Sequence, residues 1–271
     1  MLLESLYGLG VGLALGMTGG GGVLAVPALV LGLGYSLPEA APVALVAVGA
    51  SAFLGGLDGL RRGLVRYKAA LLMALGGALC APLGLRLAAV LPVAALMLLF
   101  CAVLLLIAGR MAGQALTSPA PGAVPEALRR NCMLNTETGR LRWNSRCFFS
   151  LSAIGGLSGL FSGLLGVGGG FLVVPGVRQF SNLGMHGIVA TSLMVIALIS
   201  ASTVAGFLWS GGSLSAAAWM FIAGSGCGML GGRLLAPRVP ARYLQLGFAL
   251  LAGLAALMLL GKTLISLFPL H

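Results

Sequence analysis

The chain has 271 residues, of which 59% are hydrophobic and 8% are charged. This composition, with a mean hydropathy of +1.08, excludes an ordinary soluble domain and predicts an all-α polytopic membrane protein. The net charge of +11 lies mostly in short connections between apolar runs, which favours the positive-inside pattern of membrane proteins over binding to nucleic acid.

Residues 1–112 form the predicted first transmembrane repeat, which contains four apolar segments. The first covers about 2–34 and is broken at 18–22, where Thr18 is followed by four glycines; the others cover about 38–60, 67–90 and 92–112. A helix needs roughly 20 apolar residues to span a bilayer. The three unbroken segments meet this length, whereas each arm of the broken segment is shorter.

Residues 113–147 form a polar linker, the one stretch with soluble character. Three prolines, Pro119, Pro121 and Pro125, prevent a continuous helix. The stretch from Cys132 to Trp143 then reads as two short strands around a turn at Gly139. We expect a small cytoplasmic hairpin. Cys132 and Cys147 flank this piece without a nearby histidine, which disfavours a zinc site.

Residues 148–271 form the predicted second transmembrane repeat, again with four apolar segments. They cover about 148–180 (broken at 166–170), 185–209, 213–236 and 241–265. An offset of 148 residues places Gly20–Pro27 on Gly168–Pro175. The sequence therefore predicts two tandem homologous halves, each with a Gly-rich break in its first segment.

Charge favours an inverted arrangement of the two halves. If each broken segment is a re-entrant hairpin, fourteen basic residues lie inside and two outside; if it crosses fully, the numbers are eleven and five. The re-entrant, inverted arrangement therefore fits the positive-inside rule better. Eight full crossings with kinked first helices are the alternative.

Glycines also recur at helix-contact spacing within the apolar segments. Small residues four positions apart allow membrane helices to approach closely. We expect tight helix packing at three such sets: Gly8/Gly12/Gly16, Gly155/Gly159/Gly163 and Gly224/Gly228/Gly232.

The two breaks are the predicted substrate site. Unpaired backbone groups at membrane depth survive only where protein or a water-filled cavity surrounds them, and matching breaks often mark a transporter's binding site. Free N–H groups at half-helix N-termini attract anions, and glycine lets an anion approach the backbone. The candidate ligand contacts are Gly20, Gly21, Gly22, Gly168, Gly169 and Gly170. Alternatively, these glycines only permit a sharp turn.

Three hydroxyls near the breaks are further candidate contacts. Thr18 lies in the first break, while Thr191 and Ser192 lie about one turn into the segment after the second break. Each could donate to an anion's oxygen. The alternative is a bond to a helix carbonyl, which is common for hydroxyls in membrane helices.

These motifs resemble the sulfite exporter TauE/SafE family. The resemblance lies in Gly163–Gly170 with Val173-Val174-Pro175, in Ala190–Leu193, and in the linker stretch Cys132–Trp143. It implies a duplicated four-segment layout in the cytoplasmic membrane and small sulfur-containing anions as substrates. The first half departs from the pattern, because Val43-Ala44 stands where the second has Thr191-Ser192.

We therefore expect a secondary transporter of small anions such as sulfite, thiosulfate or organosulfonates, in the inner (cytoplasmic) membrane. With two histidines and five carboxylates, the sequence offers no catalytic or metal-binding constellation, so neither an enzyme nor a cofactor is expected. An anion channel or an assembly factor without transport activity is the alternative. The sequence leaves the coupling ion, the direction and homodimer formation open.

Overall fold

The computed structural model describes residues 2–116, 132, 144–181, 184–209, 211, 215–236 and 241–267. Every regular element in these ranges is a helix, which confirms the predicted all-α class. The predicted linker hairpin lies outside the described residues, apart from Cys132, which forms an isolated bridge with Ser181.

The helices follow the predicted apolar segments closely. The first broken segment consists of α1 (Leu2–Thr18), a 3-10 turn η1 (Gly21–Leu24), the short α2 (Ala25–Pro27) and a π-helical turn η2 (Ala28–Gly32). The second consists of α6 (Ser145–Leu165) and α7 (Gly170–Phe180). The remaining helices are α3 (Leu37–Arg61), α4 (Tyr67–Val90), α5 (Val93–Leu116), α8 (Met185–Trp209), α9 (Ala216–Leu235) and α10 (Ala241–Leu267).

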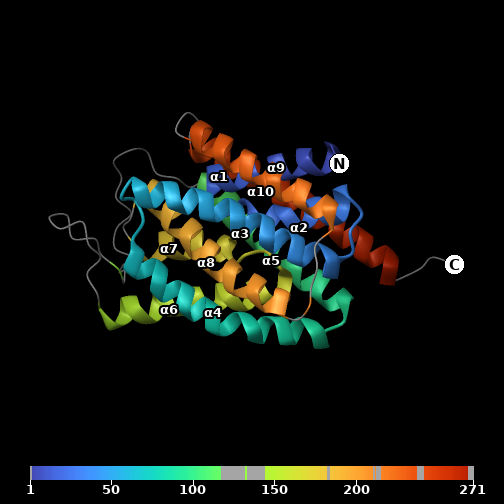
Figure 1. The fold of residues 1–271 in the computed structure, drawn as a ribbon, viewed down its shortest axis with the longest axis horizontal. Coiled ribbons are helices and arrows are strands. Elements are labelled where there is room, and N and C mark those ends of the chain that lie inside the picture. Colours follow the sequence, from blue (N-terminus) through green and yellow to red (C-terminus); the bar gives the residue numbers. More distant parts are fainter. Residues whose placement is uncertain are drawn as a thin grey trace.

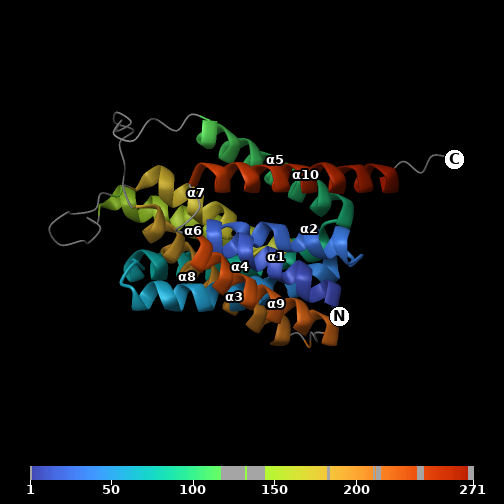
Figure 2. The same ribbon diagram turned by 90° about the horizontal axis from the view of Figure 1, so that it is seen from above.

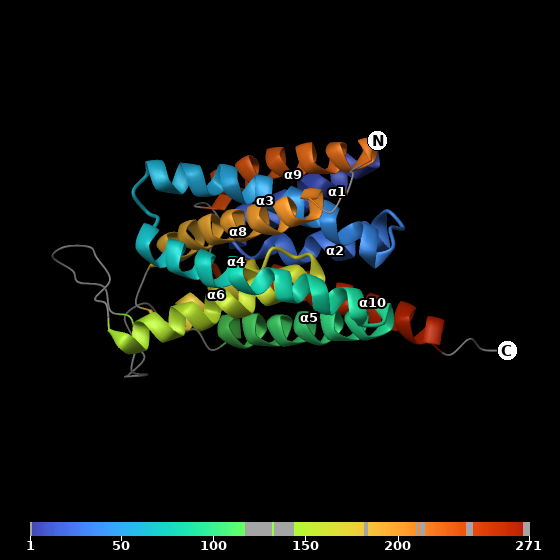
Figure 3. The ribbon, with the colours of Figure 1, turned by 60° about the horizontal axis from the view of Figure 1, so that its bottom comes forward.

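Each broken segment reverses direction at its break. Figure 1 shows α1 running leftward from the N-terminus and α2 lying on the way back to the right. The second hairpin opens at the opposite end, where α6 begins (Figures 1 and 3) and α7 ends (Figures 1 and 2). As a result, α3 and α8, which follow the two hairpins, run in opposite directions.

Four helix pairs make the most extensive contacts: α1 with α9, α4 with α6, α3 with α8, and α5 with α10. The α5–α10 pair lies along one side of the molecule in Figure 2. If the helices are matched by their order in each predicted half, α1 corresponds to α6 and α4 corresponds to α9. An exchange of the two halves therefore turns the α1–α9 pair into the α6–α4 pair. The same exchange leaves the α3–α8 and α5–α10 pairs unchanged.

The predicted glycine faces lie at the two closest helix contacts. A Cβ added at Gly8, Gly12 or Gly16 would stand less than 3.0 Å from backbone atoms of α9, and Cβ atoms at Gly224, Gly228 and Gly232 would equally crowd α1. Gly155, Gly159 and Gly163 face the backbone of α4 in the same way. These distances confirm the expected tight packing, because real Cβ atoms essentially never come this close.

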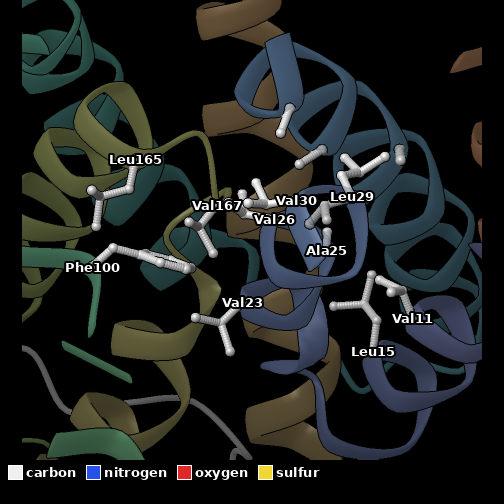
Figure 4. Packing of buried hydrophobic residues seen from close by; sticks show 14 of the residues in the cluster. Val11, Leu15, Val23, Ala25, Val26, Leu29, Val30, Phe100, Leu165 and Val167 are labelled. Carbon is white, nitrogen blue, oxygen red and sulfur yellow. The ribbon is translucent and has the colours of Figure 1, made fainter. Parts of the chain in front are cut away.

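The largest buried apolar cluster joins the two broken segments. Val23, Val26 and Val30 of the first segment share it with Leu165 and Val167 of the second. Figure 4 shows Val167 beside Val26 and Val30, with Phe100 of α5 on the same side. The core of the protein therefore forms around the two breaks.

Six of the described helices, α3, α4, α5, α6, α8 and α10, are long and apolar enough to cross a membrane. Helix α1, with 17 residues, is a shorter apolar helix. The structure thus supports a multi-pass membrane protein. The division into two homologous halves stays a prediction at this point.

The first prediction tests the glycine contact between α1 and α9. Gly12→Ala places a methyl group against the Ser225 carbonyl, and such overpacking typically costs about 1–3 kcal/mol of folding free energy. We expect lower membrane accumulation and a lower melting temperature of the purified protein. Gly10→Ala is the matched control, because no described atom of another helix lies within 4 Å of the added Cβ; equal stability of the two variants would contradict close packing.

Candidate functional site

The two Gly-rich breaks meet at the centre of the molecule. A Cβ at Gly170 would stand 3.4 Å from the Gly19 carbonyl oxygen, and a Cβ at Gly22 would stand 3.3 Å from that of Val167. Val48 of α3 contacts both breaks, since its Cγ1 lies 2.7 Å from the Cβ position of Gly22 and 3.0 Å from that of Gly168. Each break is therefore covered by the other.

Backbone conformation explains part of the glycine pattern. Gly19, Gly166, Gly168 and Gly169 have φ values of +69°, +70°, +73° and +65°, a region that residues with side chains seldom adopt. A Cβ on Gly169 would also collide with the Ser158 carbonyl. Gly169 is therefore required for the turn itself, whether or not it also contacts a ligand.

The other predicted glycines differ in their surroundings. Gly21 packs against the backbone of Ala14 and Leu15, and Gly170 packs against Ile196. Gly20 instead lines a cavity. The structure thus exposes Gly20 to a cavity, whereas the roles of Gly21, Gly22, Gly168 and Gly170 as ligand contacts stay predictions.

A cavity of about 270 Å³ reaches the first break. Thr18 and Gly20 line it together with residues of α5, α6, α7 and α10, including Ile107, Arg110, Leu157, Leu172, Arg178 and Phe248. The Thr18 hydroxyl donates to the Ala14 carbonyl at 2.7 Å and accepts the Gly20 N–H at 3.3 Å. We call this space the arginine cavity.

Two cations stand out in the mostly apolar wall of the arginine cavity. Arg110 is exposed near the end of α5, and Arg178 is half-buried near the end of α7. Positive charge in a cleft with apolar walls focuses the electric field and raises the local concentration of anions. In the sequence both residues contribute only to the charge count for topology, since nothing in their local sequence shows that α5 and α7 border one cavity.

A second cavity, of about 260 Å³, reaches the second break. Leu45, Leu96, Gly163, Gly166, Thr203 and Phe207 are among its lining residues, and none of its lining residues is charged. Its α5 residues, Val93 and Leu96, lie at the start of that helix, whereas the arginine cavity borders 106–111 near its end. The arginine cavity and this apolar cavity therefore lie at opposite ends of α5.

The neighbouring hydroxyls of α8 have different surroundings. Thr191 is fully buried, and its Oγ1 accepts the backbone N–H of Arg66 at 3.1 Å, in the connection between α3 and α4. The Ser192 hydroxyl donates to the Val189 carbonyl at 2.9 Å and lies 3.1 Å from the Cβ position of Gly19. The structure thus brings the Ser192 hydroxyl to the first break, whereas the Thr191 hydroxyl bonds to the α3–α4 connection.

One charged cluster has a structural role. Arg233 of α9 donates to the Gly55 carbonyl and lies 3.4 Å from the Asp58 carboxylate, which also pairs with Arg62 at 3.0 Å. Arg233 therefore ties α9 to α3. Among the described residues, no group of three or more His, Cys, Asp or Glu side chains could hold a metal ion.

The start of α6 is cross-linked to the linker. Cys132 and Cys147 form a disulfide, with their Cα atoms 4.9 Å apart. The Cys132 N–H donates to the Phe180 carbonyl at 3.0 Å, and Phe180 lines the arginine cavity. The linker is thus attached beside the end of α7, close to that cavity.

Comparisons with known proteins identify the chain's relatives. The family model described as "Sulfite exporter TauE/SafE" matches residues 5–259. Two proteins of Xylella fastidiosa, from strains 9a5c and Temecula1, are each named "Probable membrane transporter protein"; each is 30% identical over 188 residues, covering 69% of this chain. The match covers 66% of each relative, just under two thirds of its length. No solved structure matches the chain.

The second prediction concerns Thr191, whose hydroxyl oxygen accepts a hydrogen bond from the Arg66 backbone. Thr191→Val leaves the Arg66 N–H without its buried acceptor, which typically costs about 1–3 kcal/mol. We expect a lower melting temperature and an unchanged half-saturation concentration for the transported anion. Ser192→Ala is the comparison, because it removes a hydroxyl beside the break; a raised half-saturation in Thr191→Val alone would contradict this assignment.

Proposed function

The chain belongs to the sulfite exporter TauE/SafE family of membrane transport proteins, and we propose that it is a secondary transporter of small anions across the cytoplasmic membrane. The substrates we propose are sulfur-containing: sulfite, thiosulfate or organosulfonates. Family membership supports transport, and the chemistry of the site supports an anion.

The arginine cavity carries the proposal. Arg110 and Arg178 supply positive charge at its wall, and Thr18 and Gly20 lie where it reaches the first break. A small anion entering here passes from bulk water to a site with two guanidinium groups, which bind oxyanions through several N–H donors. The anion then reaches the first break.

The two cavities support alternating access. The arginine cavity reaches the first break and the apolar cavity reaches the second, while the breaks contact one another. A transporter needs a central site that opens to one side at a time. In this conformation the contact between the breaks is the barrier, and separation of either hairpin from it would connect one cavity to the centre.

We also propose that the halves are inverted repeats with re-entrant hairpins. The opposite openings of the hairpins support this (Figure 1), as does the exchange of helix pairs between the halves. The positive-inside count places the linker in the cytoplasm. The Cys132–Cys147 disulfide favours the opposite orientation, because disulfides persist mainly in oxidising compartments.

The third prediction tests the anion route in liposomes containing the purified protein. We expect saturable counterflow of labelled sulfite under anaerobic conditions, and Arg110→Gln should raise the half-saturation concentration several-fold with a weaker dependence on salt. Arg86→Gln is the matched control, since Arg86 is also exposed but does not line the arginine cavity. Ohmic current would indicate a channel. Absence of both counterflow and current with the wild-type protein would indicate a protein without transport activity.

The fourth prediction tests the topology by cysteine labelling in a variant without native cysteines. Ser36 and Gly184 follow the first and second hairpins, and both are exposed. In the inverted arrangement Ser36→Cys reacts from outside and Gly184→Cys from inside, with Arg61→Cys as the inside reference. Labelling of both hairpin ends from the same side would refute inversion.

A further inference from the structure

Three buried serine hydroxyls have no hydrogen-bond partner among the described residues: those of Ser158 and Ser162 on α6 and of Ser200 on α8. All three residues have an exposed fraction of 0%. Serine and threonine in membrane helices usually bond to a carbonyl of the preceding turn. Other buried hydroxyls here do so, as Thr203 does with Ile199 at 2.9 Å and Ser225 with Ile222 at 2.8 Å.

The three serines all border the second break. The Ser200 hydroxyl lies 3.2 Å from the Cβ position of Gly168, and Ser158 Cβ lies 3.0 Å from that of Gly169. Ser162 follows Ser158 by one turn of α6, and its carbonyl accepts the Gly166 N–H at 3.0 Å. Two facing helices thus bring unpaired hydroxyls to one short stretch of backbone.

The same stretch contains the beginning of α7, an 11-residue helix that starts at Gly170. Its N-cap is Gly169, which has no side chain to cap the first N–H groups of the helix. The N-terminus of a helix carries partial positive charge and unpaired N–H donors. Hydroxyl donors and a positive helix end therefore adjoin each other, which is the combination an anion requires.

The apolar cavity lies next to this place. It is lined by Gly166, the first residue of the break, and by Thr203, which follows Ser200 by one turn of α8. The equivalent positions in the first half, at an offset of 148 residues, are Gly10, Ala14 and Ala52. Among the described residues, the buried hydroxyls without a partner are therefore found at the second break and not at the equivalent positions of the first.

We infer that Ser158, Ser162 and Ser200 form a subsite that binds the terminal oxygens of an oxyanion at the second break. Three neutral donors suit a group with three oxygens on one atom, such as sulfite or a sulfonate, better than a monatomic halide. Neutral donors also hold the anion without an ion pair, so it can leave again during transport. The inference rests on the proposed function and names a substrate contact within it.

The test compares Ser158→Ala, Ser162→Ala and Ser200→Ala in anaerobic sulfite counterflow. Because each hydroxyl bonds to a charged ligand, its loss should raise the half-saturation concentration about tenfold, equivalent to about 1.4 kcal/mol. Competition by chloride should change little. The ligand-free variants should melt at or above the wild-type temperature, because alanine removes a buried polar group that had no partner.

Ser225→Ala is the matched control. Ser225 is also a buried helical serine, but its hydroxyl bonds to Ile222 and, at 3.0 Å, to Ser51 of α3. This variant should melt at a lower temperature and keep the wild-type half-saturation. A purely structural role for the three serines would instead give the same lowered melting temperature in their alanine variants, and would overturn the inference.

The remaining outcomes separate this inference from the proposed function. Unchanged half-saturation in all three alanine variants, with active wild-type protein, would overturn the subsite and leave transport intact. A change in the dependence on sodium concentration without a change for sulfite would also overturn it, since the hydroxyls would then bind a cation. Absence of counterflow in the wild type would overturn the proposed function, and the subsite with it.

Discussion

The need to cover the unpaired backbone groups of the two breaks determines the architecture of this protein. Each break interrupts a helix and leaves N–H and C=O groups that hydrocarbon cannot satisfy. The structure places the breaks against each other, with Gly170 near the Gly19 carbonyl and Gly22 near that of Val167. Helices α3 and α8 close around them, and the largest apolar cluster surrounds the contact. The same place is where a polar ligand could find donors without meeting lipid.

Close glycine contacts connect each hairpin to the other half of the chain. Helix α1 of the first hairpin packs on α9, and α6 of the second packs on α4, in both cases through glycines that leave no room for a Cβ. Such contacts form rigid pairs, because interiors packed at this density do not deform smoothly. A movement that separates the breaks would therefore carry α1 with α9 and α6 with α4. Sliding within these pairs is disfavoured, because the facing backbones leave no room for it.

The sequence predicted the helices well and the side-chain roles less well, for physical reasons. Apolar length and glycine breaks are local properties, so the observed helices begin and end close to the predicted segment boundaries, and the glycine faces follow from spacing alone. Side-chain roles depend on helix orientation. Thr191 and Ser192 are adjacent, yet successive helical residues point about 100° apart, and only Ser192 lies by a break. Likewise, the hydroxyls of Ser158 and Ser200 are recognisable only once packing shows that neither has a partner.

The two cavities differ in charge, and this difference affects the anion concentration at which such a carrier would saturate on each side of the membrane. A binding site cannot change the equilibrium across a membrane, but it sets the concentration at which each side saturates. Arg110 and Arg178 make the arginine cavity attractive to anions, whereas no charged residue lines the apolar cavity. If the linker is cytoplasmic, the arginine cavity faces the cytoplasm, because Phe180 and the attached Cys132 lie beside it. The carrier would then capture anions at low cytoplasmic concentration and release them readily on the far side, a combination that suits export.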